Sequence, residues 1–281
     1  MLQHRPHTTV VLAMSADGKI ADFRRSPARF GSKADKAHLE KQIAASDAVL
    51  FGAGTLGAYG TTLTVSDSAL VQHRVQRGKP PQPIHIVTTR FANLNPEIKF
   101  FKQPIERWLL TTTAGAVYWN RRENILPRHS PQLGKVEHGD GFSKEWQFQQ
   151  LSEPEQSTAS QTSAQERTPE FEQIMVFETP TGEIDISTAL KHLATLHITR
   201  LVVLGGGKLV ASLLELDLID ELWLTVCPLI LGGSSAPTSV DGKGFLSDLA
   251  PKLELLEVQT VEQEVFLHYR LQRQALLDYP K

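Results

Sequence analysis

The sequence predicts an α/β protein built on a mixed β-sheet, and three observations predict this class. Strand and helix patterns alternate along most of the chain, which is typical of parallel strands joined by helices. Two apolar strands lead directly into glycine turns, at Gly52 and at Gly205. The last two strand patterns, 253–261 and 265–271, have no helix between them. Such neighbours favour an antiparallel hairpin, so we expect a parallel sheet with an antiparallel C-terminal end.

The first half of the chain begins with a β-branched run, Thr8–Met14, which predicts a strand and is followed by the turn sequence SADG. A helix is expected over 32–46, because Ser32 is a typical N-cap and Asp35 lies three residues on, at the capping-box position. The remaining elements are expected in alternation: a strand at 47–51, a helix at 68–77, a strand at 84–88, and a strand at 108–112 that opens into a short helix.

The second half continues the alternation and then ends in strands alone. The expected order is a strand at 174–178, a helix at 187–196, a strand at 201–204, a helix after Gly205, and strands at 221–230, 253–261 and 265–271. Leucines at helical spacing predict the apolar stripe of the helix after Gly205, namely Leu209, Leu213, Leu214 and Leu216. Alternation in the last strand places one set of side chains on one face, namely Val265, Leu267, Tyr269 and Leu271.

A change of composition interrupts the pattern between about residues 120 and 168. This stretch is rich in Gln, Ser, Glu and Pro, and its most biased part reads SEPEQSTASQTSAQERTPE. Such a composition cannot bury enough apolar surface to offset the entropy lost on ordering. We therefore expect a single domain over 1–281 that carries a low-complexity surface insertion at about 120–168.

Bulk composition excludes several classes of function. The formal net charge of the 281 residues is −2 and no block of like charge stands out, so nucleic acid is not an expected partner. No apolar run reaches the ~18 residues that span a bilayer, and the N-terminus does not resemble a signal peptide. The single cysteine, Cys227, fits a reducing compartment and a buried structural thiol. We expect a cytoplasmic protein without a metal site, because paired histidine motifs are absent.

The sequence GAGTLG at 52–57 matches the pattern GxGxxG after a strand. A Rossmann domain would require a long helix next and an acidic residue at the end of a strand about 20 residues on. Here AYGTT follows at once, so a Rossmann domain is disfavoured. Two interpretations stay open: a loop that borders a ligand, with Gly52, Gly54 and the hydroxyl of Thr55 facing it, or a tight strand–helix turn.

The sequence GGGKL at 205–209 has a more complete context, because a buried strand precedes it and an amphipathic helix follows. Glycines have no Cβ atoms, so a phosphate can come close to the main chain of this turn. The backbone N–H groups at the helix N-terminus can then face the phosphate, which indicates a nucleotide cofactor. The spacing is not that of a P-loop. Lys208 would meet the phosphate or remain solvated, and the alternative for the whole turn is helix packing alone. Asp17, in the SADG turn, either stabilises that turn or faces a ligand.

Four segments occur together in one order: AMSADGKIA (13–21), DAVLFGAGTL (47–56), QPIHIVTT (82–89) and the stretch 201–233. This combination resembles the reductase domain of riboflavin biosynthesis, the RibD C-terminal domain family, which is related to dihydrofolate reductase; the deaminase domain that often precedes it is not expected here. The resemblance implies a dihydrofolate reductase-like three-layer α/β/α fold with a mixed sheet and an antiparallel C-terminal hairpin. It also implies NADPH as cofactor, a homodimer, and reduction of a phosphoribosylaminopyrimidine, ribosyl to ribityl, as by 5-amino-6-(5-phosphoribosylamino)uracil reductase.

The resemblance assigns candidate site residues position by position. The cofactor side would be formed by Ala13, Ser15, Gly52, Gly54, Thr55, Gly205, Gly206, Gly207, Lys208 and Leu209. The substrate side would be formed by Arg29, Tyr59, Leu63 and Leu204. Asp17 is the one carboxylate that we would name as a general acid.

The substrate side departs from the family pattern. The family's aspartate pair after the threonine loop is Ala58 and Tyr59 here, its phosphate-binding arginine falls near Ser66, and its glutamate before the double glycine is Leu204. A sugar phosphate needs cationic donors; Arg29, Lys33, Lys41 or Arg74 could supply them. Two alternatives therefore stay open beside the riboflavin-type reductase: a diverged NADPH-dependent reductase of another small carbonyl or imine, and a non-catalytic NADP-binding protein.

Overall fold

A computed structural model describes residues 4–121 and 170–272 of the chain. The chain divides into two units, and the larger combines Met1–Asn120 with Pro169–Lys281. The helices and strands reported below belong to this larger unit, apart from Arg121, the last residue of one helix. From residue 122 on, the predicted insertion at 120–168 lies outside the described residues.

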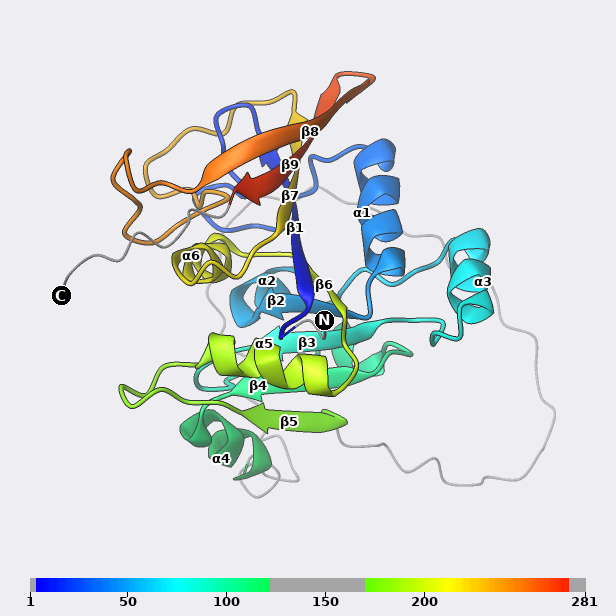
Figure 1. Ribbon diagram of the computed structural model, residues 1–281, viewed down its shortest axis with the longest axis vertical. Coiled ribbons are helices and arrows are strands. Elements are labelled where there is room, and N and C mark those ends of the chain that lie inside the picture. The colour runs from blue at the N-terminus through cyan, green and yellow to red at the C-terminus, as the bar shows by residue number, and fades with distance from the viewer. Residues whose placement is uncertain (1–3, 122–169, 273–281) are drawn as a thin grey trace, which may run out of the picture. The chain divides into compact units, whose positions relative to one another are not determined.

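Nine strands of the described residues form one mixed sheet in the order β5-β4-β3-β2-β6-β1-β7-β9-β8 (Figure 1). The pairs from β5 to β7 are parallel, whereas β9 is antiparallel to both β7 and β8. The predicted parallel sheet with an antiparallel end is confirmed. The strands are β1 (His7–Ser15), β2 (Ala48–Gly52), β3 (Ile84–Thr88), β4 (Arg107–Thr111), β5 (Gln173–Val176), β6 (Arg200–Val203), β7 (Glu221–Cys227), β8 (Lys252–Val261) and β9 (Glu264–Gln272).

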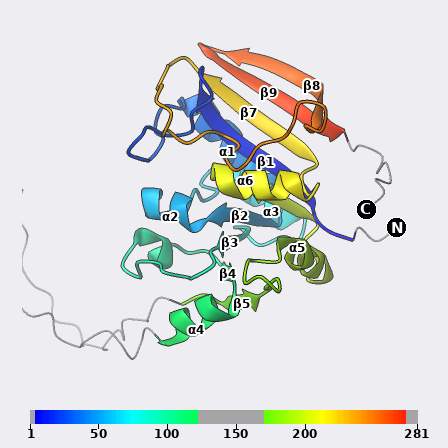
Figure 2. The ribbon, with the colours of Figure 1, turned by 90° about the vertical axis from the view of Figure 1, so that its left-hand side faces the viewer.

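Helices cover both faces of the sheet, which gives the three layers (Figure 2). Side chains of α5 and α6 pack into one apolar cluster, and side chains of α1 to α4 pack into a second cluster on the other face. The bounds are α1 (Lys33–Ala45), α2 (Ala53–Tyr59), α3 (Ser68–Gln76), α4 (Thr113–Arg121), α5 (Ile186–Thr195) and α6 (Gly207–Glu215), with a 3₁₀ turn η1 (Lys99–Lys102).

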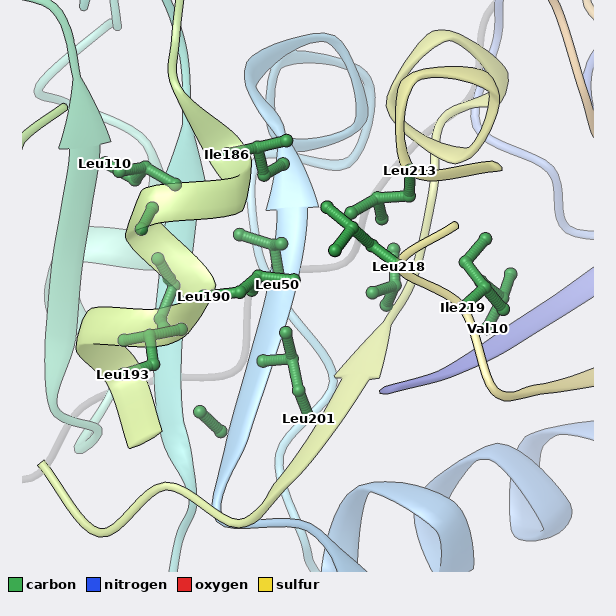
Figure 3. Close-up of a cluster of buried hydrophobic side chains, with 14 of the residues drawn as sticks. Val10, Leu50, Leu110, Ile186, Leu190, Leu193, Leu201, Leu213, Leu218 and Ile219 are labelled. Carbon is green, nitrogen blue, oxygen red and sulfur yellow. The ribbon is translucent and has the colours of Figure 1, made fainter. Parts of the chain in front are cut away.

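The first cluster shows how the strand pattern produces the core. Parallel strands buried on both faces alternate their side chains between the two helical layers. Leu50 of β2 and Leu201 of β6 point toward α5 and meet Leu190, which is fully buried (Figure 3). On the opposite face, Val49 and Phe51 of β2 enter the second cluster. This packing fixes the carboxyl ends of the parallel strands along a single edge.

Two sequence expectations need correction. The glycine sequence after β2 is not a loop, because residues 53–59 form α2, and Leu56 anchors this helix with 1% of its surface exposed. Leu216 does not belong to the buried stripe of α6: it caps the helix and is half exposed, whereas Val210 and Ala211 are buried. The predicted alternation of β9 is confirmed, and Phe266 on its other face is also buried, because α1 covers that face.

Arg74 of α3 is also not available to a ligand. Its guanidinium is buried and donates to the carbonyl oxygens of Ala44 (2.8 Å), Ser46 (2.6 Å) and Pro80 (2.9 Å). Arginine can hold three carbonyls at once because its donors form a planar fork. Arg74 therefore joins α3 to the end of α1 and does not compensate for a missing phosphate ligand.

Asp47 joins the starts of β2, β3 and β6. Its carboxylate accepts hydrogen bonds from Lys79 Nζ (2.6 Å), from Thr199 N and Oγ1 (2.9 and 2.8 Å) and from Arg200 N (2.9 Å). Burial raises the pKa of Asp47, but these hydrogen bonds outweigh burial and lower the pKa below its ordinary value.

Replacing Asp47 by Asn should lower the free energy of unfolding by about 1–3 kcal/mol at pH 7, because buried donors lose a charged acceptor. A lowered folded-state pKa gives stability that is present above the ordinary pKa of about 4 and lost as the pH falls through the folded value. Urea unfolding of wild type and Asp47→Asn should therefore converge as the pH falls below about 4. The exposed Asp248→Asn serves as control, and a difference that does not change with pH would contradict this role of Asp47.

Candidate functional site

Two glycine turns lie side by side at the carboxyl edge of the parallel strands. Strands β2 and β6 are neighbours in the sheet, so the chain leaves both at the same place. The N–H of Gly52 donates to the carbonyl of Gly205 over 3.0 Å. A Cβ built on Gly206 would lie 3.6 Å from Thr55 Oγ1. The start of α2 and the start of α6 therefore lie side by side (Figure 1).

The N-termini of α2 and α6 differ from those of α1, α3 and α5 in how they are capped. Ser32, Asp67 and Asp185 cap α1, α3 and α5 with side-chain oxygens. Glycines stand at the N-caps of α2 and α6, Gly52 and Gly206, and neither helix has a side-chain cap. The first N–H groups of a helix carry its positive dipole end and accept an anionic partner. The arrangement is suited to a phosphate group.

Two of the three glycines at the start of α6 have structural reasons. Gly205 has a φ of +87°, in the region that favours glycine. A Cβ on Gly207 would overlap the carbonyl oxygen of Thr238. Gly206 is different, because a Cβ there would make only an ordinary contact with Thr55. Backbone conformation therefore accounts for Gly205 and close packing for Gly207, whereas neither reason applies to Gly206.

The other predicted cofactor residues differ in how far they are buried. Ser15 is fully buried at the end of β1, and Ala13 is half-buried two residues before it. Gly54 and Lys208 are exposed in the first turns of α2 and α6. Leu209 is half-buried and packs against the first apolar cluster.

Asp17 holds a loop in place. Its carboxylate accepts hydrogen bonds from Ser15 Oγ (2.6 Å), Leu231 N (3.1 Å) and Gly232 N (2.8 Å). These bonds, with Ser15 making the largest contribution, lower the pKa of Asp17 to about 2. Such a group stays ionised at neutral pH and has no proton to donate, so its geometry favours anchoring the loop over acid catalysis.

A buried carboxylate from the end of the chain lies at the start of α1. Glu264, 3% exposed, accepts hydrogen bonds from Ser32 N (2.8 Å) and Ser32 Oγ (2.5 Å). Cys227 Sγ donates to the same carboxylate over 3.5 Å. Burial first, and then the charges of Glu264 and Asp35, raise the pKa of Cys227 to about 12. The thiol is therefore neutral, as expected for a structural cysteine.

Asp35 lies in the first turn of α1 and donates its backbone N–H to Ser32 Oγ over 3.2 Å. The expected capping box does not form, because Glu264 takes the N–H of Ser32. Burial raises the pKa of Asp35, and the side chain of Thr225 opposes that rise. Thr225 pairs with Ala13 in the parallel β1–β7 ladder, so the two side chains share the face that α1 covers. Asp35 therefore lies beside a predicted cofactor position, and no local pattern could indicate this.

The predicted substrate residues divide into two groups. Tyr59, at the end of α2, donates its hydroxyl to the carbonyl of Ala28 over 2.8 Å and interacts electrostatically with Arg29 and Asp35. Burial is the main cause that raises the pKa of Tyr59. Leu63 and Leu204 are half-buried and pack against the second apolar cluster. The structure thus brings Tyr59, Arg29 and Asp35 together and uses the two leucines for packing.

The described ranges 4–121 and 170–272 hold no group of three or more His, Cys, Asp or Glu side chains placed to bind a metal ion. A cavity of about 420 Å³ is lined by His7, Arg77, Lys79, Thr199 and Arg200. It lies at the amino ends of the parallel strands, at the opposite edge from the glycine turns. No helix in the same ranges is long and apolar enough to cross a membrane.

Solved structures share this architecture. A pyrimidine reductase-like protein from Corynebacterium diphtheriae superposes with a TM-score of 0.68 at 16% identity, over 96% of this chain and 93% of that chain. The deaminase and 5-amino-6-(5-phosphoribosylamino)uracil reductase of Thermotoga maritima gives a TM-score of 0.63 at 17% identity, over 95% of this chain and 57% of its own. The predicted fold class is confirmed.

Sequence relatives carry names from riboflavin biosynthesis. The 2,5-diamino-6-ribosylamino-4(3H)-pyrimidinone 5′-phosphate reductase of Archaeoglobus fulgidus is 27% identical over 243 residues, covering 86% of this chain and 89% of the relative. The enzyme of the same name from Methanothermobacter thermautotrophicus is 25% identical over 268 residues, covering 94% and 98%. The family model described as the RibD C-terminal domain matches residues 6–133 and 145–267. The chain therefore belongs to the RibD C-terminal domain family.

Proposed function

We propose that the protein is an NADPH-dependent reductase that converts the ribosyl group of a phosphoribosylaminopyrimidine into a ribityl chain. The observation that carries this proposal is the pair of uncapped, glycine-started helices at one sheet edge, beside the α1 face of β1 and β7. The names of the relatives supply the substrate class. The two supports are independent, because one concerns the cofactor and the other the substrate.

The residues at the glycine turns fit a dinucleotide diphosphate. The backbone N–H groups of Gly206, Gly207 and Lys208 would bind its oxygens at the start of α6, and the Lys208 ammonium would add a charge. The hydroxyl of Thr55 and the N-terminal turn of α2, with Gly52 and Gly54, would complete the cradle. When bound, NADPH supplies the hydride that reduces the sugar carbon C1′.

The chain's own contribution is to bind and orient the substrate and to exclude water. Ala13 and Ser15 would border the nicotinamide at the end of β1, where a small residue leaves room. Asp17 would keep the 229–233 loop closed over this end, through its bonds to Leu231 and Gly232. Holding the two reacting carbons in near-attack geometry would lower the barrier of the reduction.

The substrate would lie between α1 and the end of α2. Arg29 is exposed and interacts with Tyr59, so it is the cation that we propose for the substrate phosphate. Tyr59 would hold the 28–29 segment through its bond to Ala28. Leu63 and Leu204 would form an apolar wall behind the pyrimidine. Leu204 also favours the second candidate, a reductase of another carbonyl or imine, because the resembling family has a glutamate there.

The exposed face of the C-terminal hairpin supports the expected homodimer. Leu253, Leu255 and Val258 of the edge strand β8 are 42–54% exposed and pair with Leu271, Tyr269 and Leu267 of β9, so they share one face. A contiguous apolar patch on an edge strand marks an interaction surface. We propose a second copy of the chain as the partner that covers it.

Gly206→Leu should raise the dissociation constant for NADPH at least tenfold, about 1.4 kcal/mol, because its side chain would fill the space between the turn and Thr55. The melting temperature should change little. Gly206→Ala serves as the matched control and should bind nearly as well as wild type. Isothermal titration calorimetry and thermal unfolding of the three proteins provide the measurement. Unchanged affinity in Gly206→Leu would mean that the diphosphate binds elsewhere.

Purified protein should oxidise NADPH, followed by absorbance, only when the phosphoribosylaminopyrimidine is present. The 2,5-diamino-pyrimidinone and the 5-amino-uracil forms should be compared, since the relatives carry both names. Tight NADPH binding without turnover of either compound would contradict the riboflavin-type activity and favour the diverged reductase. Failure to bind NADPH would contradict both reductase proposals. Binding of NADP⁺ in that case would favour the non-catalytic alternative.

Sedimentation equilibrium should show a dimer for the wild type. The double variant Leu255→Glu, Val258→Glu should shift the protein to a monomer, because two charges cannot be buried unpaired in the interface. A matched change at the far end of the sheet, Val176→Glu on the exposed side of β5, should leave the dimer intact. A monomeric wild type would contradict this interface.

A further inference from the structure

The cavity at the amino ends of the parallel strands belongs to neither the proposed cofactor site nor the proposed substrate site. Its volume is about 420 Å³, and its lining consists of His7, Arg77, Lys79, Thr199 and Arg200. We call it the basic cavity. The glycine turns lie at the carboxyl ends of the same strands, so the sheet separates the two places by the length of its strands.

The lining comes from three segments that the fold brings together. His7 and Arg200 are paired positions in the parallel ladder of β1 and β6. Leu201 enters the first apolar cluster, so alternation along β6 places Arg200 on the opposite face, where α3 packs. Arg77 is the C-cap of α3, and Lys79 lies in the turn from α3 to β3. Basic residues far apart in the sequence thus meet at one place.

The Asp47 carboxylate holds this lining in place. It accepts hydrogen bonds from Lys79 Nζ (2.6 Å), from Thr199 N and Oγ1 (2.9 and 2.8 Å) and from Arg200 N (2.9 Å). All four donors belong to residues of the lining. The bond from Lys79 uses one of its three ammonium donors and leaves two for another partner. The lining is therefore ordered before a ligand arrives, which reduces the entropy cost of binding.

The positive charges of the lining are only partly balanced. Asp47 balances Lys79 in an ion pair. In the described ranges 4–121 and 170–272, no carboxylate forms an ion pair with Arg77 or Arg200. The end of α3 gives Arg77 a structural reason, because a cation there meets the negative end of the helix dipole. Arg200 begins a strand and has no such reason.

This combination of charge and size is suited to a small phosphorylated molecule. Guanidinium groups bind phosphate oxygens in pairs, and an ammonium adds a point charge. Small-molecule sites have volumes of about 300–1,000 Å³, and the basic cavity falls in the lower part of that range. His7 contributes a ring nitrogen, which can form a hydrogen bond with a hydroxyl group of the ligand.

We propose that the basic cavity binds a phosphomonoester of sugar-phosphate size, at a site separate from those of the cofactor and the substrate. The phosphate oxygens lie between the guanidinium groups of Arg77 and Arg200, with the Lys79 ammonium as a third donor group. The sugar hydroxyl groups face His7. This inference does not depend on the reductase activity, because the lining shares no residue with the glycine turns or with the proposed substrate region.

Amide ¹H–¹⁵N NMR of the full chain during a titration with ribose 5-phosphate, at constant ionic strength, tests the site. The amide signals of Arg77, Lys79, Thr199 and Arg200 should shift and reach saturation, and they should do so equally when NADPH is present at a saturating concentration. Ribose should cause no shift, because the phosphate is the recognised group. Inorganic phosphate should bind at least about tenfold more weakly, because it lacks the sugar.

Arg200→Gln removes an exposed guanidinium, so the protein should fold and keep its other amide signals. The dissociation constant for ribose 5-phosphate, measured at the amides of Lys79 and Thr199, should rise at least about tenfold. Any shift at Arg29, in the proposed substrate region, should remain. Lys191→Gln is the matched control, because it removes one exposed positive charge from α5, on the other face of the sheet, and it should bind as the wild type does.

Each contrary result overturns a stated part of this inference. Shifts confined to Arg29 or to the glycine turns, or equal affinity in Arg200→Gln and the wild type, would overturn the basic cavity as a phosphate site. Displacement by NADPH would overturn the separation of the two sites, and equal affinity for inorganic phosphate would overturn the role of the sugar. A protein without reductase activity would still give these results, so the failure of either proposal is recognised separately.

Discussion

The parallel pairing of β2 with β6 positions the whole candidate site. It places the chain exits of two strands, separated by about 150 residues in sequence, at one edge of the sheet. The bond from Gly52 N–H to the Gly205 carbonyl then holds the two turns together over 3.0 Å. Because β1 lies on the other side of β6, its end at Ser15 reaches the same edge. The uncapped helix starts, the loop that Asp17 anchors and the Asp35 region all depend on this alignment.

Electrostatics divides the site into a cationic and an acidic part. The first turn of α6 presents backbone N–H groups and Lys208, which suit a diphosphate. On the α1 side, the acidic residues Asp35 and Glu264 stand beside Thr225 and Cys227. The proposed cofactor and substrate would lie across these two parts. The family membership and this division of charge support the same reductase chemistry.

Much of this could be predicted from the sequence because the information was local. Ser32 caps α1 and the Ile84–Thr88 strand has the predicted bounds, since a capping oxygen and an apolar run each act on their neighbours. The α2 helix was missed because Gly60 and the two threonines after it have poor helix propensity. Its stability comes from the burial of Leu56, which is a tertiary contact. Glu264 takes the N–H of Ser32 that a capping box would use, and it lies more than 200 residues away, so no spacing rule could predict this contact.

The proposed cofactor site depends on the glycine turn at the start of α6, which would bind the cofactor diphosphate. Amide ¹H–¹⁵N NMR during an NADPH titration can locate this contact, because the N–H groups themselves report it. The largest shift changes should appear at Gly206, Gly207 and Lys208, while Arg77 and Arg200 at the opposite edge should change little. Largest changes at Arg77 and Arg200, with the glycine amides unchanged, would place the diphosphate in the basic cavity and contradict the proposed site.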